Sequence, residues 1–392
     1  MTDATGSRTT RKFIQLEAAR GIAAIVVVFH HFALAFLPWV KSPVSDGGVQ
    51  YTPAFVLVNG NAAITFFFVL SGFVLTYGFY QTPSGVALAR SVVKRLPRLL
   101  VPASVTIIAG WLIYRFEPPF FITAGIENRS EWLEGFAAAT FPDGVSPTFG
   151  SALKQIFLVF LIPRYFFYNS NLWTMFNEFY GSLLVFALSG VSVAWLRRTR
   201  FGVAIVHIVL ALVFYAVDPA FVDFVVGSGM AYRLANRKTL PAPFRKELLW
   251  VGLLIAVIGF SCDFWPGHAV ASSVVMLILL GNGPARRVLS GSSGRILGLV
   301  SFPIYLVHTL VILGLSSWLF AVLKDAGLGP MPILLLVLLA TLAGTGLSGL
   351  PLVWIEKTWV PALNSLMRRL IPSKAAAGSD GSDAAAASAT VE

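Results

Sequence analysis

The stretch "RGIAAIVVVFHHF" (residues 20–32) joins an apolar run to an arginine at its start and two histidines at its end. It lies within the apolar segment 14–37, which has the length of a bilayer-spanning helix. Ionisable side chains inside a membrane helix are costly, and they usually face other helices or a cavity. The stretch therefore predicts a membrane helix with a functional face.

The composition of the whole chain is that of a membrane protein. Of its 392 residues, 56% are hydrophobic and 12% are charged, and the mean hydropathy is +0.77. Soluble domains carry about 25% charged residues, so a water-soluble fold is excluded. Cys262 is the only cysteine, which excludes an intramolecular disulfide and a cysteine metal cluster. We expect no metal.

We expect an all-α polytopic bundle of about ten transmembrane helices. The candidate spans lie near 14–37, 54–79, 99–116, 171–195, 201–217, 220–235, 248–263, 268–282, 296–322 and 331–355. A further apolar piece near 149–162 looks too short to cross and is expected to be interfacial or re-entrant. The expected organisation is an N-terminal segment (1–13), a membrane domain (14–360) and a basic, low-complexity tail (361–392).

Basic residues give the expected orientation. With the N-terminus in the cytoplasm, six of the 29 lysines and arginines fall outside: Lys41, Arg115, Arg129, Lys154, Arg164 and Lys324. By the positive-inside rule, both termini are then cytoplasmic, and the protein is a multi-pass protein of the cell membrane, the inner membrane in a bacterium. The net charge of +11 is spread between apolar segments, so lipid and not nucleic acid is the expected neighbour.

Helical geometry relates the ionisable residues of the first span. Arg20 and His31 are eleven residues apart, so they lie on one face, about 16 Å apart along the axis. Glu17 is three residues before Arg20 and close enough to neutralise it. His30 is rotated by about 100° toward a different neighbour. The alternative is that Arg20 reaches the headgroups and that the histidines merely end the helix.

Four further stretches form an ordered set with the first, "LEAARGIAAIVVVFHHF" (16–32). They are "FFFVLSGFVLTYGF" (66–79), "VVKRLPRLLVP" (92–102), "NLWTMFNEFYGSLLVF" (171–186) and "SFPIYLVHTLVI" (301–312). This set resembles the acyltransferase family 3 membrane proteins, from about residue 13 to 360. The family pattern of Arg or Lys, ten residues and then His selects His31 over His30. Arg95 and Arg98 match the paired-arginine element of the family.

The resemblance implies a bundle of ten or so helices around a tunnel. It also implies transfer of an acyl group from cytoplasmic acyl-CoA, by default acetyl-CoA, to a hydroxyl of a carbohydrate or another acceptor across the membrane. Glu17 replaces the usual Asp of the first motif. The motif with Trp173 and Glu178 is nearer to a less common variant, which leaves the class of acceptor open.

The residue types suggest roles in that reaction. Arg95 and Arg98 are expected to bind the phosphates of the donor, unless they serve only as topology signals. Arg20 would guide the pantetheine arm or bind a phosphate. His31 is expected to be the base toward the acceptor or the nucleophile that takes the acyl group. The sequence does not separate these two routes.

Glu178 is the second candidate catalyst, because a carboxylate within an apolar span needs a partner or a function. It would orient His31, act as a base toward the acceptor, or make a structural contact. Residues expected to line the tunnel or touch substrate are Glu17, Ser71, Trp173, Tyr305 and His308. Alternatives for them are close helix packing at Ser71, an interfacial anchor at Trp173 and a helix–helix contact at His308.

Three acidic residues lie near the expected outer ends of spans: Asp218, Asp223 and Asp263. They either touch a sugar or are simply solvated.

Two other functions also fit buried ionisable groups. A proton-coupled transporter of a small polar or glycan-type substrate fits Gly-interrupted spans but usually shows internal repeats, and none is visible here. A glycosyltransferase using lipid-linked sugars would need acidic metal-binding clusters, for which the spacing is not recognisable.

Overall fold

The structure is a computed structural model that describes residues 13–116, 118–137, 141, 146–195, 199, 201–237, 244–281 and 283–372. Most of the expected N-terminal segment and the tail beyond residue 372 lie outside these residues. Within the described ranges the chain is helical, without a strand, and one isolated bridge joins Pro43 to Gln50. The prediction of an all-α fold is confirmed.

Six spans are long and apolar enough to cross a membrane by themselves within the described chain. They are α1 (Ile14–Phe36), α2 (Gly60–Gln81), α3 (Gly85–Phe116), α7 (Trp173–Ala194) with the turn η4 (Ser170–Leu172), the run α13 (Ser292–Val311), η6 (Ile312–Ser316) and α14 (Ser317–Asp325), and α15 (Pro330–Leu370). The pair α11 (Trp265–Gly281) and α12 (Gly283–Leu289), bent by 90°, would make a seventh. These helices make the chain a multi-pass membrane protein.

The four remaining predicted spans coincide with shorter helices: α8 (Gly202–Val217), α9 (Pro219–Ala235), α10 (Lys246–Ser261) and α11. They have 16 or 17 residues, or about 24–26 Å at 1.5 Å per residue, against a hydrocarbon core of about 30 Å. The number of about ten spans therefore stays a prediction. The piece near 149–162 forms α6 (Phe149–Leu158), which is too short to cross.

Two boundaries differ from the sequence reading. The span expected at 99–116 is the second half of α3, which begins at Gly85 and contains Pro97 and Pro102. Similarly, α15 runs on past residue 355 to Leu370. The charged and proline residues in these extensions ended the apolar windows, but membrane helices tolerate proline. The two extensions also pack together, since Trp359 Nε1 donates to Pro97 O over 3.0 Å.

Two close helix pairs position the functional residues. In the α2–α9 pair, a Cβ added at Gly72 would lie 2.1 Å from Phe224 O, so the two helices pack closely beside Ser71, as the alternative for this residue held. In the α1–α13 pair, a Cβ added at Gly298 would lie 2.7 Å from the Cβ of Glu17. Because only glycine allows such approaches, the two pairs hold their backbones in fixed register.

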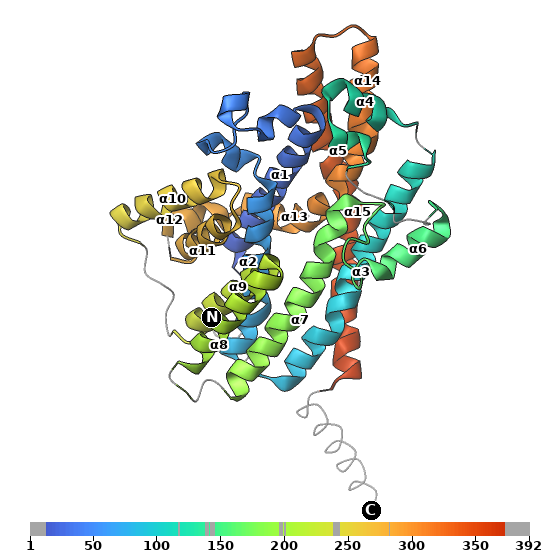
Figure 1. The fold of residues 1–392 in the computed structure, drawn as a ribbon. Helices are drawn as coiled ribbons and strands as arrows, with labels where there is room; N and C mark the ends of the chain where they lie inside the picture. Colours follow the sequence, from blue (N-terminus) through green and yellow to red (C-terminus); the bar gives the residue numbers. More distant parts are fainter. Residues whose placement is uncertain are drawn as a thin grey trace, which may run out of the picture.

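A small cap covers the end of the bundle at which α1 ends (Figure 1). It consists of α4 (Phe120–Asn128) and α5 (Glu131–Glu134), near α14. Lys324 of α14 forms an ion pair with Glu127 of α4, and the Ser130 hydroxyl donates to Leu34 O over 2.6 Å. The cap is thus fastened to both α14 and α1. Short 3₁₀ turns connect α1 to α2: η1 (Pro38–Lys41), η2 (Val44–Asp46) and η3 (Pro53–Leu57).

Candidate active site

Arg20 is held against α13. Its Nη2 forms an ion pair with Glu17 Oε2 at 2.8 Å and donates to Gly298 O at 3.1 Å. Its Nε donates to Ser301 Oγ at 2.8 Å. The partnership with Glu17 that their spacing predicts is therefore present, and Glu17 neutralises part of the charge on the guanidinium.

His31 lies further along α1, also against α13. Its Nδ1 is 2.7 Å from Nε2 of His308, whose side chain is completely buried. Trp132 of the cap stacks on the His31 ring, with the centroids 5.2 Å apart. Ser301 and His308 are seven residues, about two turns, apart on α13. Arg20 and His31 thus contact one helix, as their spacing predicts.

His30 points elsewhere, as its rotation predicts. Its Nδ1 is 2.7 Å from Val58 O, which precedes α2. A Cβ added at Gly60 would lie 2.6 Å from the His30 ring, so the imidazole packs directly on the first turn of α2. The two adjacent histidines therefore have separate surroundings.

Hydrogen-bond partners assign the tautomers of the histidine pair. Nδ1 of His308 lies 3.1 Å from Ile304 O, which can only accept, so this nitrogen carries the hydrogen. Asn171 Nδ2 is a longer contact at 3.4 Å and already donates to Tyr305 O and Thr309 Oγ1. Nε2 of a neutral His308 must then accept from Nδ1–H of His31. The Nε2 of His31 is left with a lone pair and has no hydrogen-bond partner within the described chain.

A second cluster joins α2, α3 and α7. Arg95 Nη2 lies 2.5 Å from Glu178 Oε2, and its Nε donates to Ser182 Oγ at 2.9 Å. The Ser71 hydroxyl donates to Glu178 Oε1 at 3.0 Å. Glu178 thus pairs with Arg95 and Ser71, whereas His31 pairs with His308, so Glu178 does not orient His31 as one expectation held. A buried guanidinium requires a carboxylate partner, and Glu178 supplies it.

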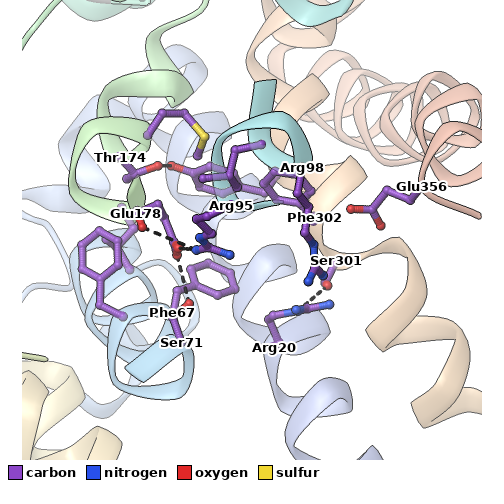
Figure 2. Close-up of a pocket in the computed structure, with 15 residues that line it drawn as sticks. Arg20, Phe67, Ser71, Arg95, Arg98, Thr174, Glu178, Ser301, Phe302 and Glu356 are labelled. Atoms are coloured by element: carbon purple, nitrogen blue, oxygen red, sulfur yellow. Dashed lines mark hydrogen bonds and ion pairs between the residues drawn. The ribbon is translucent and has the colours of Figure 1, made fainter. Parts of the chain in front are cut away.

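A cavity of about 120 Å³ lies between Arg20 and the Arg95–Glu178 cluster (Figure 2). Glu178, Arg95 and Ser71 gather on one side of it, and Arg20 and Ser301 on the other. Its walls include six predicted residues: Arg20, Ser71, Arg95, Arg98, Glu178 and Tyr305. The cavity therefore brings together all three arginines expected to bind the donor.

The two arginines of the paired element have different surroundings. Arg95 is 8% exposed and bound to Glu178, whereas Arg98 is exposed while still lining the cavity. Arg98 makes no hydrogen bond or ion pair with any residue that the structure describes. Glu356 shares the cavity but forms no ion pair with Arg98 or Arg20 within the described ranges. Arg98 is thus a cation available at the opening of the cavity.

Four predicted residues lie outside the wall of this cavity. His31 and His308 lie beside it: Tyr305 lines the cavity, and its ring centroid is 6.1 Å from that of His308. Glu17 contacts it only through Arg20. Trp173 lines a different, larger cavity of about 680 Å³. The predicted tunnel from Arg20 to His31 is therefore interrupted at Tyr305, whose hydroxyl donates to Asn171 O over 2.8 Å.

Sequence reasoning missed several residues of the site. The cavity is also lined by Ser301, Thr174 and Glu356. The first two lie in the quoted stretches 301–312 and 171–186, and the third follows the last predicted span. A carboxylate at Glu356, directly after the last apolar segment (331–355), was a usable signal. Asn171 begins the quoted stretch 171–186 and Trp132 lies outside every quoted stretch, and only the folded chain brings them to His308 and His31.

Comparisons with known proteins agree with this arrangement. The model of acyltransferase family 3, described as an acyltransferase domain, matches residues 13–349. The O-acetyltransferase PaAT-1 of Phomopsis amygdali is 23% identical over an alignment of 365 residues, and the match covers 75% of this chain and 71% of that protein. No solved structure matches the chain. On the extent of the family match, the chain belongs to acyltransferase family 3 and is a multi-pass membrane acyltransferase.

Proposed function

We propose that this protein transfers an acyl group, in the simplest case acetyl, from acyl-CoA to a hydroxyl of a carbohydrate acceptor. The observation that carries the proposal is the cavity in which an unpaired arginine, Arg98, stands at the opening and the His31–His308 pair lies behind Tyr305. The name of the relative from Phomopsis amygdali, an O-acetyltransferase, supports the choice of acetyl and of a hydroxyl acceptor.

Arg98 is the residue suited to hold the phosphates of the donor. Phosphate oxygens accept charge-assisted hydrogen bonds from a guanidinium, and Arg98 lines the cavity without a hydrogen bond or ion pair to any of the described residues. A cavity this small can receive the acyl thioester end of a donor, and the nucleotide must then lie outside it, beside Arg98. Arg20, which lines the same cavity, would contact the pantetheine arm. Arg95 would act indirectly, by fixing Glu178 and the wall.

His31 is suited to be the base, because its neutral Nε2 has a lone pair that no residue in the described part of the chain engages. The acceptor oxygen attacks the thioester carbonyl carbon, the new C–O bond forms, and the C–S bond breaks. The hydroxyl proton passes to His31 Nε2 and then to the leaving thiolate of CoA. During the step, His308 Nε2 accepts from His31 Nδ1–H and thereby keeps the ring oriented, as an outer partner does in other catalytic histidines.

The orientation expected from the basic residues would place the opening beside Arg98 in the cytoplasm, where acyl-CoA is made. The acceptor would then be modified from the other side, and the protein would lie in the cell membrane. An acceptor such as an exported polysaccharide or a lipid-linked glycan fits this direction.

Acetyl transfer is tested with purified protein in detergent or vesicles, acetyl-CoA labelled in the acetyl group, and soluble glycosides as acceptors. We expect release of the CoA thiol that depends on acceptor and appearance of label in the glycoside. A transporter would bind or move its substrate and leave the thioester intact, so an intact thioester in the presence of bound glycoside would contradict the proposal.

A further inference from the structure

A second cavity, of about 680 Å³, opens where α2, α7, α9 and α11 begin. The residues that matter here are Asn61 of α2, Trp173 and Asn177 of α7, Asp218 and Asp223 at α9, and Trp265 of α11. Asn61 and Trp173 are exposed, whereas Asp223 is 1% exposed. The cavity therefore runs from an exposed rim to a buried carboxylate.

Asp223 has an unsatisfied acceptor. Trp265 Nε1 donates to its Oδ2 over 3.2 Å, but its Oδ1 is buried and has no partner among the described residues. A buried polar atom without a hydrogen bond is costly. Because Asp223 lines the cavity, a hydroxyl entering from that side would supply the missing donor.

Two further aspartates that line the cavity, Asp218 and Asp263, are held in place by amides. Asn177 Nδ2 donates to Asp218 Oδ2 over 2.9 Å, and Asn61 Nδ2 donates to Asp263 Oδ1 over 3.0 Å. None of the three aspartates forms an ion pair within the part of the chain that the structure describes. Arg164 is the only arginine or lysine that lines this cavity among the described residues. The wall is therefore rich in acceptors and unfavourable for a phosphate or carboxylate ligand.

Flat apolar side chains complete the wall. Trp173 and Trp265 line the cavity together with Phe68, Phe166 and Phe176. A sugar ring has hydroxyls that donate to carboxylates and C–H faces that pack on aromatic rings, so this combination matches a neutral, polyhydroxylated ring. It is the usual composition of a small-molecule site, apolar with a few fixed polar groups.

The second cavity adjoins the first. Ile64 and Phe68 line both cavities, and α7 contributes Glu178 to the first and Asn177 to the second. Two apolar side chains of α2 thus form the shared wall. A ligand in the second cavity would lie next to the space that receives the thioester.

We infer that the second cavity is the acceptor site and that it binds a neutral sugar ring through Asp223 and Asp218, with Trp173 and Trp265 as stacking surfaces. The inference rests on the proposed function for the word acceptor, but the binding of sugar stands on the cavity itself. Asp223 would then select the acceptor, because its carboxylate accepts a hydrogen bond from a sugar hydroxyl.

The test uses the full-length protein in detergent and methyl glycosides of glucose, galactose, mannose and rhamnose. Binding is followed by tryptophan fluorescence, and acetyl transfer from acetyl-CoA by mass spectrometry. For a glycoside that binds, Asp223→Asn should raise the Kd and the acceptor KM by about tenfold or more, with the KM for acetyl-CoA unchanged. Asp46→Asn, in an exposed turn, is the matched control and should change neither.

Trp173→Ala gives an independent arm if Asp223→Asn fails to fold, because Trp173 is 39% exposed. It should also weaken glycoside binding and leave the KM for acetyl-CoA unchanged. No saturable binding of any glycoside to the wild type, or equal binding by the wild type and both variants, would overturn the inference. Glycoside binding without acetyl transfer would instead refute the proposed function and leave the sugar site standing.

Discussion

Nδ1 of His31 lies 2.7 Å from Nε2 of His308, and this contact joins α1 to α13 between residues 277 positions apart in the chain. The backbone carbonyl of Ile304 fixes the hydrogen of His308 on the opposite nitrogen. The direction of the bond follows from these two contacts. His31 donates, and its other nitrogen is free to accept a proton from substrate.

The role of His308 as a positioning residue is tested by substitution. His308→Ala should lower kcat by about 10- to 100-fold, the effect known for losing an outer partner of a metal-binding histidine, with little change in the KM for acetyl-CoA. His308→Gln should recover part of kcat, because its amide oxygen can accept from His31 Nδ1–H. His207→Ala removes a buried histidine of α8 and is the control. Equal kcat values for His308→Ala, His308→Gln and the wild type would contradict this role.

Arg98 and Arg95 should behave differently, although they belong to one motif. Arg98→Gln should raise the KM for acetyl-CoA by about tenfold or more, since it removes a charged partner of phosphate. The melting temperature should stay unchanged, because Arg98 is exposed and unpaired in the described structure. A donor KM equal to that of the wild type would return Arg98 to a topological role.

Arg95→Gln should mainly destabilise the protein. It leaves Glu178 without its partner, and breaking a buried ion pair costs about 3–5 kcal/mol. The measurement is thermal unfolding in detergent, compared with Arg98→Gln. A variant that unfolds like the wild type and loses only donor affinity would show that Arg95, too, binds phosphate directly.

The expected orientation is tested with a reporter fused after Glu392. Most of the basic residues fall on one side of the membrane in the expected topology, so a reporter that is active only in the cytoplasm should be active at this end. A fusion at Gly47, in the turn that follows α1, should give the opposite result. An inactive reporter at residue 392 together with an active one at Gly47 would contradict this topology and reverse the direction of acyl flow.

Relations within one helix were predictable from the sequence. The eleven-residue spacing placed Arg20 and His31 on one face because helical periodicity is local, and both do contact α13. The same periodicity turned His30 away, to Val58. The apolar segments likewise indicated the helices, because burial of backbone polar groups in lipid leaves few other structures.

Relations between helices were not predictable. Arg95 and Glu178 are 83 residues apart, and no local pattern indicates that they pair. The number of spans was uncertain for a related reason: α8 to α11 are apolar but short, and composition alone does not show whether such helices cross. Trp132 reaches His31 only because the cap folds back onto α1.

The central claim, that His31 is the base of an acyl transfer, is tested most directly by comparing two adjacent histidines. His31→Ala and His30→Ala are purified, and acceptor-dependent release of the CoA thiol from acetyl-CoA is measured for each. We predict that His31→Ala loses about 10²–10⁴-fold, the usual contribution of positioned proton transfer, with normal expression. His30→Ala should keep a substantial fraction, because His30 faces Val58 and Gly60. Equal losses in the two variants, or a loss in His30→Ala alone, would contradict the account.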